Sequence, residues 1–113
     1  MFTKTKIAVI ATLGLAQFSA VAQAETVLNV ATAGSQNMVD YVKTYLAPKF
    51  EAMHPDVKIK VVGTGPGDAG SHKIFEKLSA QQDSNQANWD VDVAVVHQKI
   101  GGEMVKEGLL AKY

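Results

Sequence analysis

Apolar and polar positions along the chain predict three β-strands. Residues 26–33 (TVLNVATA) are apolar or β-branched at nearly every position, which is typical of a strand covered on both faces of a parallel sheet. Residues 57–62 (VKIKVV) alternate apolar and lysine side chains and predict a second strand. Residues 91–96 (VDVAVV) predict a third.

A helix is expected after the first strand. It begins near Gln36, with Ser35 placed as its N-cap. Pro48 lacks an N–H group and crowds the preceding turn, so a kink or break is expected near Ala47, and Pro55 closes the segment. The apolar residues at helical spacing are Met38, Val42, Tyr45, Leu46, Phe50 and Met53.

Two further helices follow the second and third strands. Residues 71–78 predict the opening of the second helix, with Ser71 as its cap, and residues 81–88 are polar enough to predict a surface loop. The third helix is expected from about residue 99 to residue 106, with Gly108 as its stop. The side chains expected to face inward are Ile74, Phe75 and Leu78 in the second helix and Ile100, Met104 and Val105 in the third.

This β-α-β-α-β-α order predicts an α/β fold in which three βα units form a parallel sheet with flanking helices. In such sheets ligands bind beyond the carboxyl ends of the strands, where the connecting loops open on one edge. The candidate ligand-binding residues in these loops are Gly34, Ser35, Gln36, Gly65, Gly67, Asp68, Ala69, Gly70, Ser71 and His97.

The glycine-rich turn at residues 63–71 is the strongest of these candidates. Glycine lets a ligand approach the backbone, and N–H groups at a helix N-terminus favour negative charge. Residues 65–70 match the G-x-G-x-x-G pattern of dinucleotide folds, but the match follows the second strand and contains Pro66, so no dinucleotide is expected. A phosphate loop is excluded because Ser71-His72 stands where Lys-Ser/Thr is required. Simple connection geometry is the alternative explanation of the turn.

The side chains near this turn leave several roles open. Asp68 could accept a hydrogen bond from a ligand or hold the turn through its own backbone. His97 is more typical of a structural hydrogen-bonding residue than of a catalyst. The spacing of the three histidines predicts no metal site, and no nucleophile has a recognisable local context, so neither an enzyme nor a cofactor is expected.

Three residues before or within the third strand are expected to have structural or solvated roles. Trp89 is expected to cap the packing of the core rather than to bind a sugar. Asp90 and Asp92 are expected at the amino edge of the sheet, exposed to water and away from the proposed site.

The N-terminal residues 1–24 have the three parts of a secretory signal peptide. Residues 1–6 are basic, residues 7–18 are apolar but too short to span a bilayer comfortably, and Ala22-Gln23-Ala24 is a small-x-small cleavage site. We therefore expect a chain that starts at Glu25 and enters the periplasm or the medium without membrane insertion.

Composition narrows the possible partners. Without Lys4 and Lys6 the chain carries nine Lys against eleven Asp and Glu, a net charge of −2. This weakly acidic balance does not indicate a basic surface for binding nucleic acid. The absence of Arg removes bidentate clamps on carboxylate or phosphate. The absence of Cys removes both disulfides and a lipid-modified cysteine after the signal.

The order of short sequence features resembles the first lobe of bacterial extracellular solute-binding proteins, the periplasmic receptors of ABC-type importers. The features are Leu28-Asn29-Val30, Phe50-Glu51, Pro55-Asp56-Val57-Lys58-Ile59, Gly65-Pro66-Gly67-Asp68, Trp89-Asp90-Val91-Asp92-Val93 and Gly108-Leu109-Leu110. The resemblance implies that residues 25–113 are the first of two lobes, that a small solute binds in the cleft between lobes, and that the closed receptor docks on a membrane permease. It also implies a truncated chain, since members of the family are much longer.

Two other interpretations stay open from the sequence. One is an exported enzyme that uses a phosphate- or nucleotide-containing substrate at the glycine-rich turn. The other is a fragment that binds nothing, because half a cleft cannot enclose a ligand.

Overall fold

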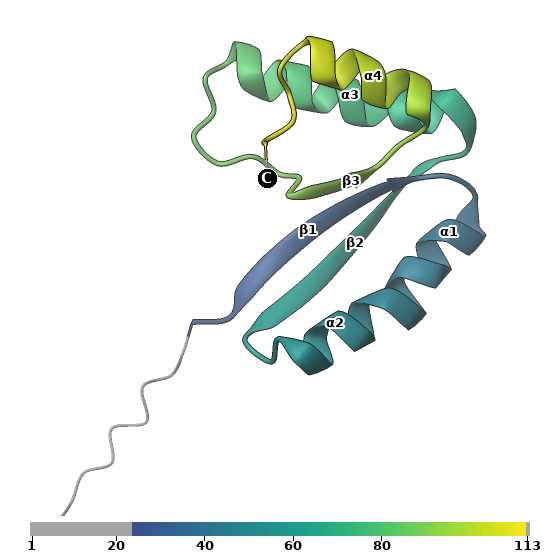
Figure 1. The fold of residues 1–113 in the computed structure, drawn as a ribbon, viewed down its shortest axis with the longest axis vertical. Coiled ribbons are helices and arrows are strands. Elements are labelled where there is room, and N and C mark those ends of the chain that lie inside the picture. Colours follow the sequence, from purple (N-terminus) through teal and green to yellow (C-terminus); the bar gives the residue numbers. More distant parts are fainter. Residues whose placement is uncertain (1–23, 113) are drawn as a thin grey trace, which may run out of the picture.

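A three-stranded parallel sheet forms the centre of the molecule in the computed structural model, which describes residues 24–112. The strands are β1 (Thr26–Ala33), β2 (Val57–Gly65) and β3 (Val93–Val95), in the order β2-β1-β3 (Figure 1). β1 pairs in parallel with both neighbours, and this central position explains its nearly continuous apolar sequence. The predicted α/β fold with a parallel sheet and flanking helices is confirmed at this level.

The helix after β1 is continuous through Ala47, so a break, one of the two outcomes expected there, does not occur. It consists of α1 (Gln36–Tyr41), a π-helical stretch η1 (Val42–Leu46) and α2 (Ala47–Met53). Leu46 and Ala47 both keep right-handed helical backbone angles. Pro48 has no N–H group to donate to the carbonyl four residues earlier, and the wider π turns directly before it accommodate that loss.

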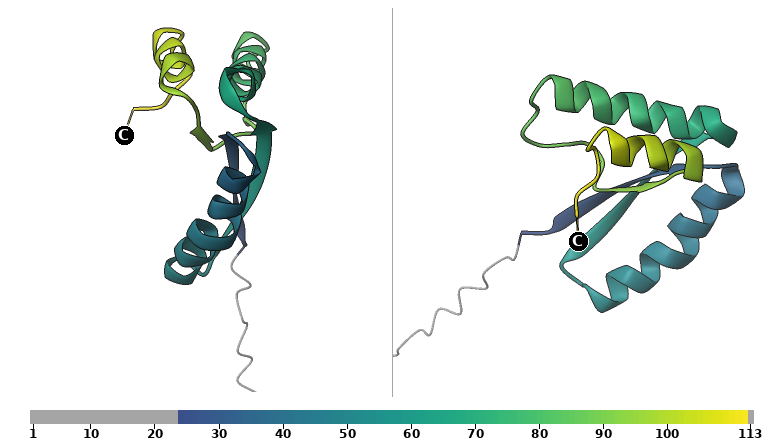
Figure 2. Two further views of the ribbon diagram at one scale, coloured as in Figure 1. Left: turned by 90° about the vertical axis from the view of Figure 1, so that its right-hand side faces the viewer. Right: turned by 45° about the horizontal axis from the view of Figure 1, so that its top comes forward.

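The other two helices lie on the opposite face of the sheet (Figures 1 and 2). α3 (Gly67–Asp83) begins four residues before the expected start, and it includes residues 81–83, which we expected in a loop. The residue before its first turn is Pro66, whose fixed φ of −74° suits the entry to a helix, so Ser71 is not its cap. α4 (Gln98–Lys106) agrees with the prediction to within one residue.

The main core lies between the sheet and the α3–α4 pair. Its buried members are Ala31, Ala33, Ile74, Leu78, Ile100, Met104 and Leu109. Val105, which was expected to face inward, is 66% exposed. Ile100 and Met104 are four residues apart and share one face of α4, whereas Val105 is rotated a further 100° or so from that face.

The end of α4 follows the expected pattern. Gly108 adopts a left-handed φ of 68°, and the N–H of Leu109 donates to the carbonyl of Met104 at 3.0 Å. This turn brings Leu109 back into the core, where it is buried.

Two strands differ in length from the prediction, since β2 (Val57–Gly65) continues past residue 62, where it was expected to end. β3 covers residues 93–95 rather than 91–96. The predicted signal peptide and its cleavage site fall almost entirely outside the described residues and stay a prediction. Within residues 24–112, no helix combines the length and apolar character needed to cross a membrane.

Candidate functional site

The loops after β1 and β2 meet at the carboxyl edge of the sheet. The N–H of Gly34 donates to the carbonyl of Gly65 at 2.9 Å, which ties the end of β1 to the end of β2. The predicted glycine-rich turn is shorter than expected, because residues 63–65 belong to β2 and residues 67–71 to α3. A register shift between Thr32 and Ala33 places one extra residue, Thr64, in β2 at this point. Gly34 and Gly65 have φ values of 126° and 101°, which strongly favour glycine at both positions.

Gly70 lets α3 approach the strand end more closely than any other residue would allow. A Cβ atom at Gly70 would overlap the carbonyl oxygen of Gly65 and stand 2.7 Å from its carbonyl carbon. The hydroxyl of Thr64 lies 2.8 Å from the carbonyl oxygen of Gly70, in position to donate to it. The glycines of this turn therefore have a structural explanation of their own, independent of any ligand.

The third loop joins the same edge through His97. Its backbone N–H donates to Ser71 Oγ at 2.9 Å, and its ring Nδ1 lies 3.1 Å from Asp68 Oδ1. Ser71 is fully buried, whereas the side chains of His97 and Asp68 are 48% and 65% exposed. His97 thus contacts Ser71 and Asp68, which lie 26 and 29 positions before it in the chain. The His97–Asp68 pair is open to solvent.

Ser71 has a role that the sequence did not indicate. It was expected as the cap of α3, yet it lies inside the helix and accepts the hydrogen bond that positions the β3–α4 loop. Ser71, His97 and Asp68 also do not form a catalytic triad. The serine oxygen contacts the main chain of His97 rather than its ring, and it has no exposed surface with which to attack a substrate.

The side chains of the loop after β1 make no hydrogen bond to the other two loops in the described structure. Ser35 occupies the N-cap position of α1 as expected, but within the described chain its hydroxyl makes no capping hydrogen bond. The amide of Gln36 donates to Asp40 Oδ1 at 2.9 Å along its own helix. Both side chains are exposed.

The start of α3 supplies backbone donors at the centre of this edge. The first N–H groups of a helix have no intrahelical partners, and those of Gly67, Asp68 and Ala69 occupy these positions. Gly67 and Ala69 are exposed, so a solute could reach this backbone. Asp68 adds an acidic side chain in the same turn, which complements the helix dipole.

Trp89 has the packing role expected of it, whereas Asp90 and Asp92 make contacts that were not expected. Trp89 packs against the core as expected and donates from Nε1 to the carbonyl of Gln86 at 3.1 Å. Asp90 and Asp92 are exposed, but neither is simply solvated: Asp90 pairs with Lys77 at 3.0 Å, and Asp92 accepts from the N–H of Asn29 at 2.7 Å.

We call the residues Gly34–Gln36, Gly65–Ser71 and His97 the carboxyl rim. Whether these residues bind a ligand stays a prediction. Among residues 24–112, no group of three or more His, Asp or Glu side chains could hold a metal ion.

No protein-family model, curated protein or solved structure matched the chain.

Proposed function

We propose that the chain is a lobe of a periplasmic solute-binding protein that captures a small solute for an ABC-type importer. The observation that supports this most is the convergence of three loops on one edge. Gly34 bonds to Gly65, and His97 contacts both Ser71 and Asp68. Such an edge beyond parallel strands is where α/β proteins bind ligands.

The chemistry of the carboxyl rim suits a small polar solute. The N–H groups at the start of α3 offer donors without any Arg, and the exposed carboxylate of Asp68 offers an acceptor. His97 uses Nδ1 toward Asp68, which leaves Nε2 for a ligand. One lobe covers only one side of such a solute, so a second lobe would provide the enclosure that high affinity requires. A membrane permease is the proposed partner of the complete receptor.

A thermal-shift screen of small solutes tests this proposal. A solute at ten times its dissociation constant should stabilise the fold by about 1.4 kcal/mol. For a domain of this size that is a rise in melting temperature of roughly 6 to 11 °C. His97→Ala should abolish the rise, whereas the control His54→Ala, which lies just before β2 at the other end of the sheet, should keep it.

The enzyme alternative is favoured by one observation, the exposed Asp68–His97 pair beside backbone donors. It predicts hydrolysis of a phosphate ester that is lost in both Asp68→Asn and His97→Ala. The receptor proposal predicts binding without turnover, so catalysis that depends on this pair would overturn it.

A further inference from the structure

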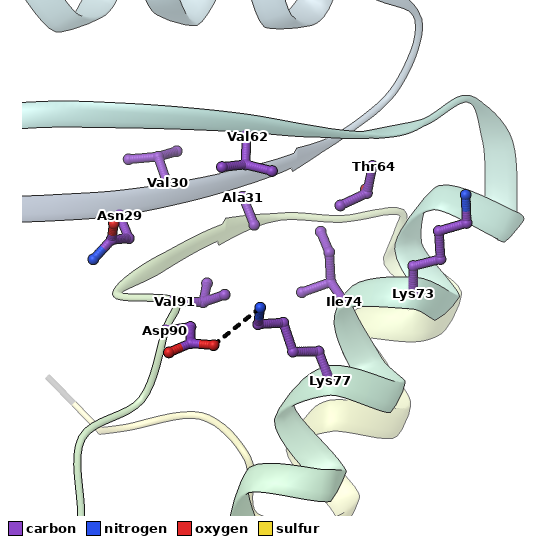
Figure 3. Close-up of a pocket in the computed structure, with 10 residues that line it drawn as sticks. All are labelled: Asn29, Val30, Ala31, Val62, Thr64, Lys73, Ile74, Lys77, Asp90 and Val91. Carbon is purple, nitrogen blue, oxygen red and sulfur yellow. Dashed lines mark ion pairs between the residues drawn. The ribbon is translucent and has the colours of Figure 1, made fainter.

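A pocket of about 210 Å³ opens on the face of the sheet that carries α3, apart from the carboxyl rim (Figure 3). Ala31 of β1 and Val62 of β2 contribute to its floor, and Ile74 of α3 and Val91 contribute to its walls. None of the residues of the carboxyl rim lines it. The pocket therefore needs an explanation that is independent of the proposed solute site.

Val62 is the exposed apolar side chain of the pocket. Side chains alternate along β2, so this face of the strand presents Lys58, Lys60 and Val62, and Thr64, at the register shift, lines the same pocket as Val62. Val62 is the single wholly apolar side chain among them, yet it is 48% exposed, while Ile74 in the same pocket is 1% exposed. The accessible apolar surface of the pocket therefore comes from Val62 and the half-buried Val91, while Ile74 lies buried beneath them.

The charges at the pocket favour an anion. Lys73 and Lys77 lie on successive turns of α3, and both line the pocket. Lys77 reaches Asp90 at 3.0 Å, whereas no described carboxylate lies within 4.0 Å of Lys73 (Figure 3). Lys73 lies at the other end of the pocket from Asp90, and Figure 3 shows its side chain extending away from Ile74, so a ligand would meet this cation at the edge of the pocket.

We propose that this pocket binds a small carboxylate with an aromatic or branched apolar body. The body would cover Val62 and Val91, above the buried Ile74, and the carboxylate would lie toward Lys73. An aliphatic cavity of about 150 Å³ is large enough for benzene, so 210 Å³ suits a single ring with one polar group. Drug-sized ligands need roughly 300 Å³ or more, so the expected affinity is only millimolar.

Benzoate is the probe for the first experiment, with benzamide as a neutral compound of nearly the same shape. Each is titrated to about 20 mM, well above the expected millimolar dissociation constant, into the ¹⁵N- and methyl-labelled chain at fixed ionic strength. Benzoate should shift the methyl signals of Val62, Ile74 and Val91, and benzamide should bind more weakly. An absence of saturable shifts at these methyl groups would overturn the proposal, as would benzamide binding as tightly as benzoate.

Three variants separate the charge from the apolar contact. Lys73→Met keeps the length of the side chain and should weaken benzoate about two- to fivefold, as expected for one exposed ion pair, without weakening benzamide. Lys58→Met removes a lysine from the same face of β2 outside the pocket and should change neither titration. Val62→Thr should weaken both compounds. Equal effects of Lys73→Met and Lys58→Met would show non-specific attraction and refute the site.

Benzoate binding at the pocket can be tested separately from solute binding at the carboxyl rim. His97→Ala, which should abolish solute binding at the carboxyl rim, should leave the benzoate titration unchanged. Loss of benzoate binding in this folded variant would contradict the assignment of benzoate to the pocket.

Discussion

Replacement of Gly70 by alanine tests the close approach that aligns α3 with the end of β2. The added Cβ would overlap the carbonyl oxygen of Gly65 and lie 2.7 Å from its carbonyl carbon, whereas ordinary contacts begin at 3.4 Å. The added Cβ and the carbonyl carbon of Gly65 would have to separate by about 0.7 Å, the difference between these two distances. Because the obstacle is backbone rather than a flexible side chain, the strand end or the helix must move.

The expected cost of Gly70→Ala follows from two opposing terms. Overpacking against backbone costs about 3 kcal/mol at the upper end of its usual range. Alanine returns about 1 kcal/mol because it favours the helix more than glycine does. We therefore expect a net loss of about 2 kcal/mol in the free energy of unfolding, a large fraction of the roughly 5 kcal/mol typical of a small domain.

Gly102→Ala is the matched control. Gly102 lies in α4 and is exposed, and a Cβ atom added there would have open space for 4 Å around it. The same change should therefore stabilise the chain by about 0.5 to 1 kcal/mol. Urea unfolding followed by circular dichroism compares the two variants with the parent chain. A Gly70→Ala chain as stable as the parent, or stabilised like Gly102→Ala, would refute the close approach.

Four further substitutions probe other parts of the structure by the same unfolding assay. Ser71→Ala leaves the backbone N–H of His97 without its acceptor and should cost about 1 to 3 kcal/mol; a neutral effect would contradict the contact. Met104→Ala should cost about 2 to 5 kcal/mol because Met104 is fully buried, whereas Val105→Ala on the exposed side of α4 should change stability by less than about 0.5 kcal/mol; similar losses would contradict the observed facing of the helix. Lys77→Met should change stability by no more than about 1 kcal/mol, since its ion pair is half exposed, and a larger loss would show that the pair is structural.

The parallel sheet could be predicted from the sequence because each strand carries its own local signal. The nearly continuous apolar run at residues 26–33 reflects coverage of β1 on both faces and pairing on both edges. The alternation at residues 57–62 reflects a strand with half-buried and exposed sides. These patterns lie within short stretches of sequence, so the strands can be predicted without knowledge of the tertiary structure.

The boundaries of α3 could not be predicted because they depend on tertiary contacts. Ser71 has the chemistry of a cap, but its hydroxyl is taken by the backbone of His97, and the helix starts earlier at Gly67. Gln81 looked like part of a polar loop, yet it is buried and its side-chain oxygen accepts from the N–H of Asp90 at 3.2 Å. In both residues a polar group is satisfied by a partner that lies outside the local helix.

The candidate site was predictable as a set of loops but not in its contacts. Parallel strands bring Gly34, Gly65 and His97 to one edge whatever their side chains are. The pairing of Asp68 with His97 and the hydroxyl of Thr64 beside Gly70 depend on the register shift in β2 and on the close approach of α3. No spacing in the sequence indicates either contact.

Amide chemical-shift mapping is the most direct test of solute binding at the carboxyl rim. The ¹⁵N-labelled chain is titrated with a panel of small polar solutes at millimolar concentration, since one lobe should bind weakly. A solute that binds as proposed should shift the amides of Gly34–Gln36, Gly65–Ser71 and His97 together, with one dissociation constant. Shifts confined to other surfaces, or no saturable shift at these amides with any solute, would contradict the account.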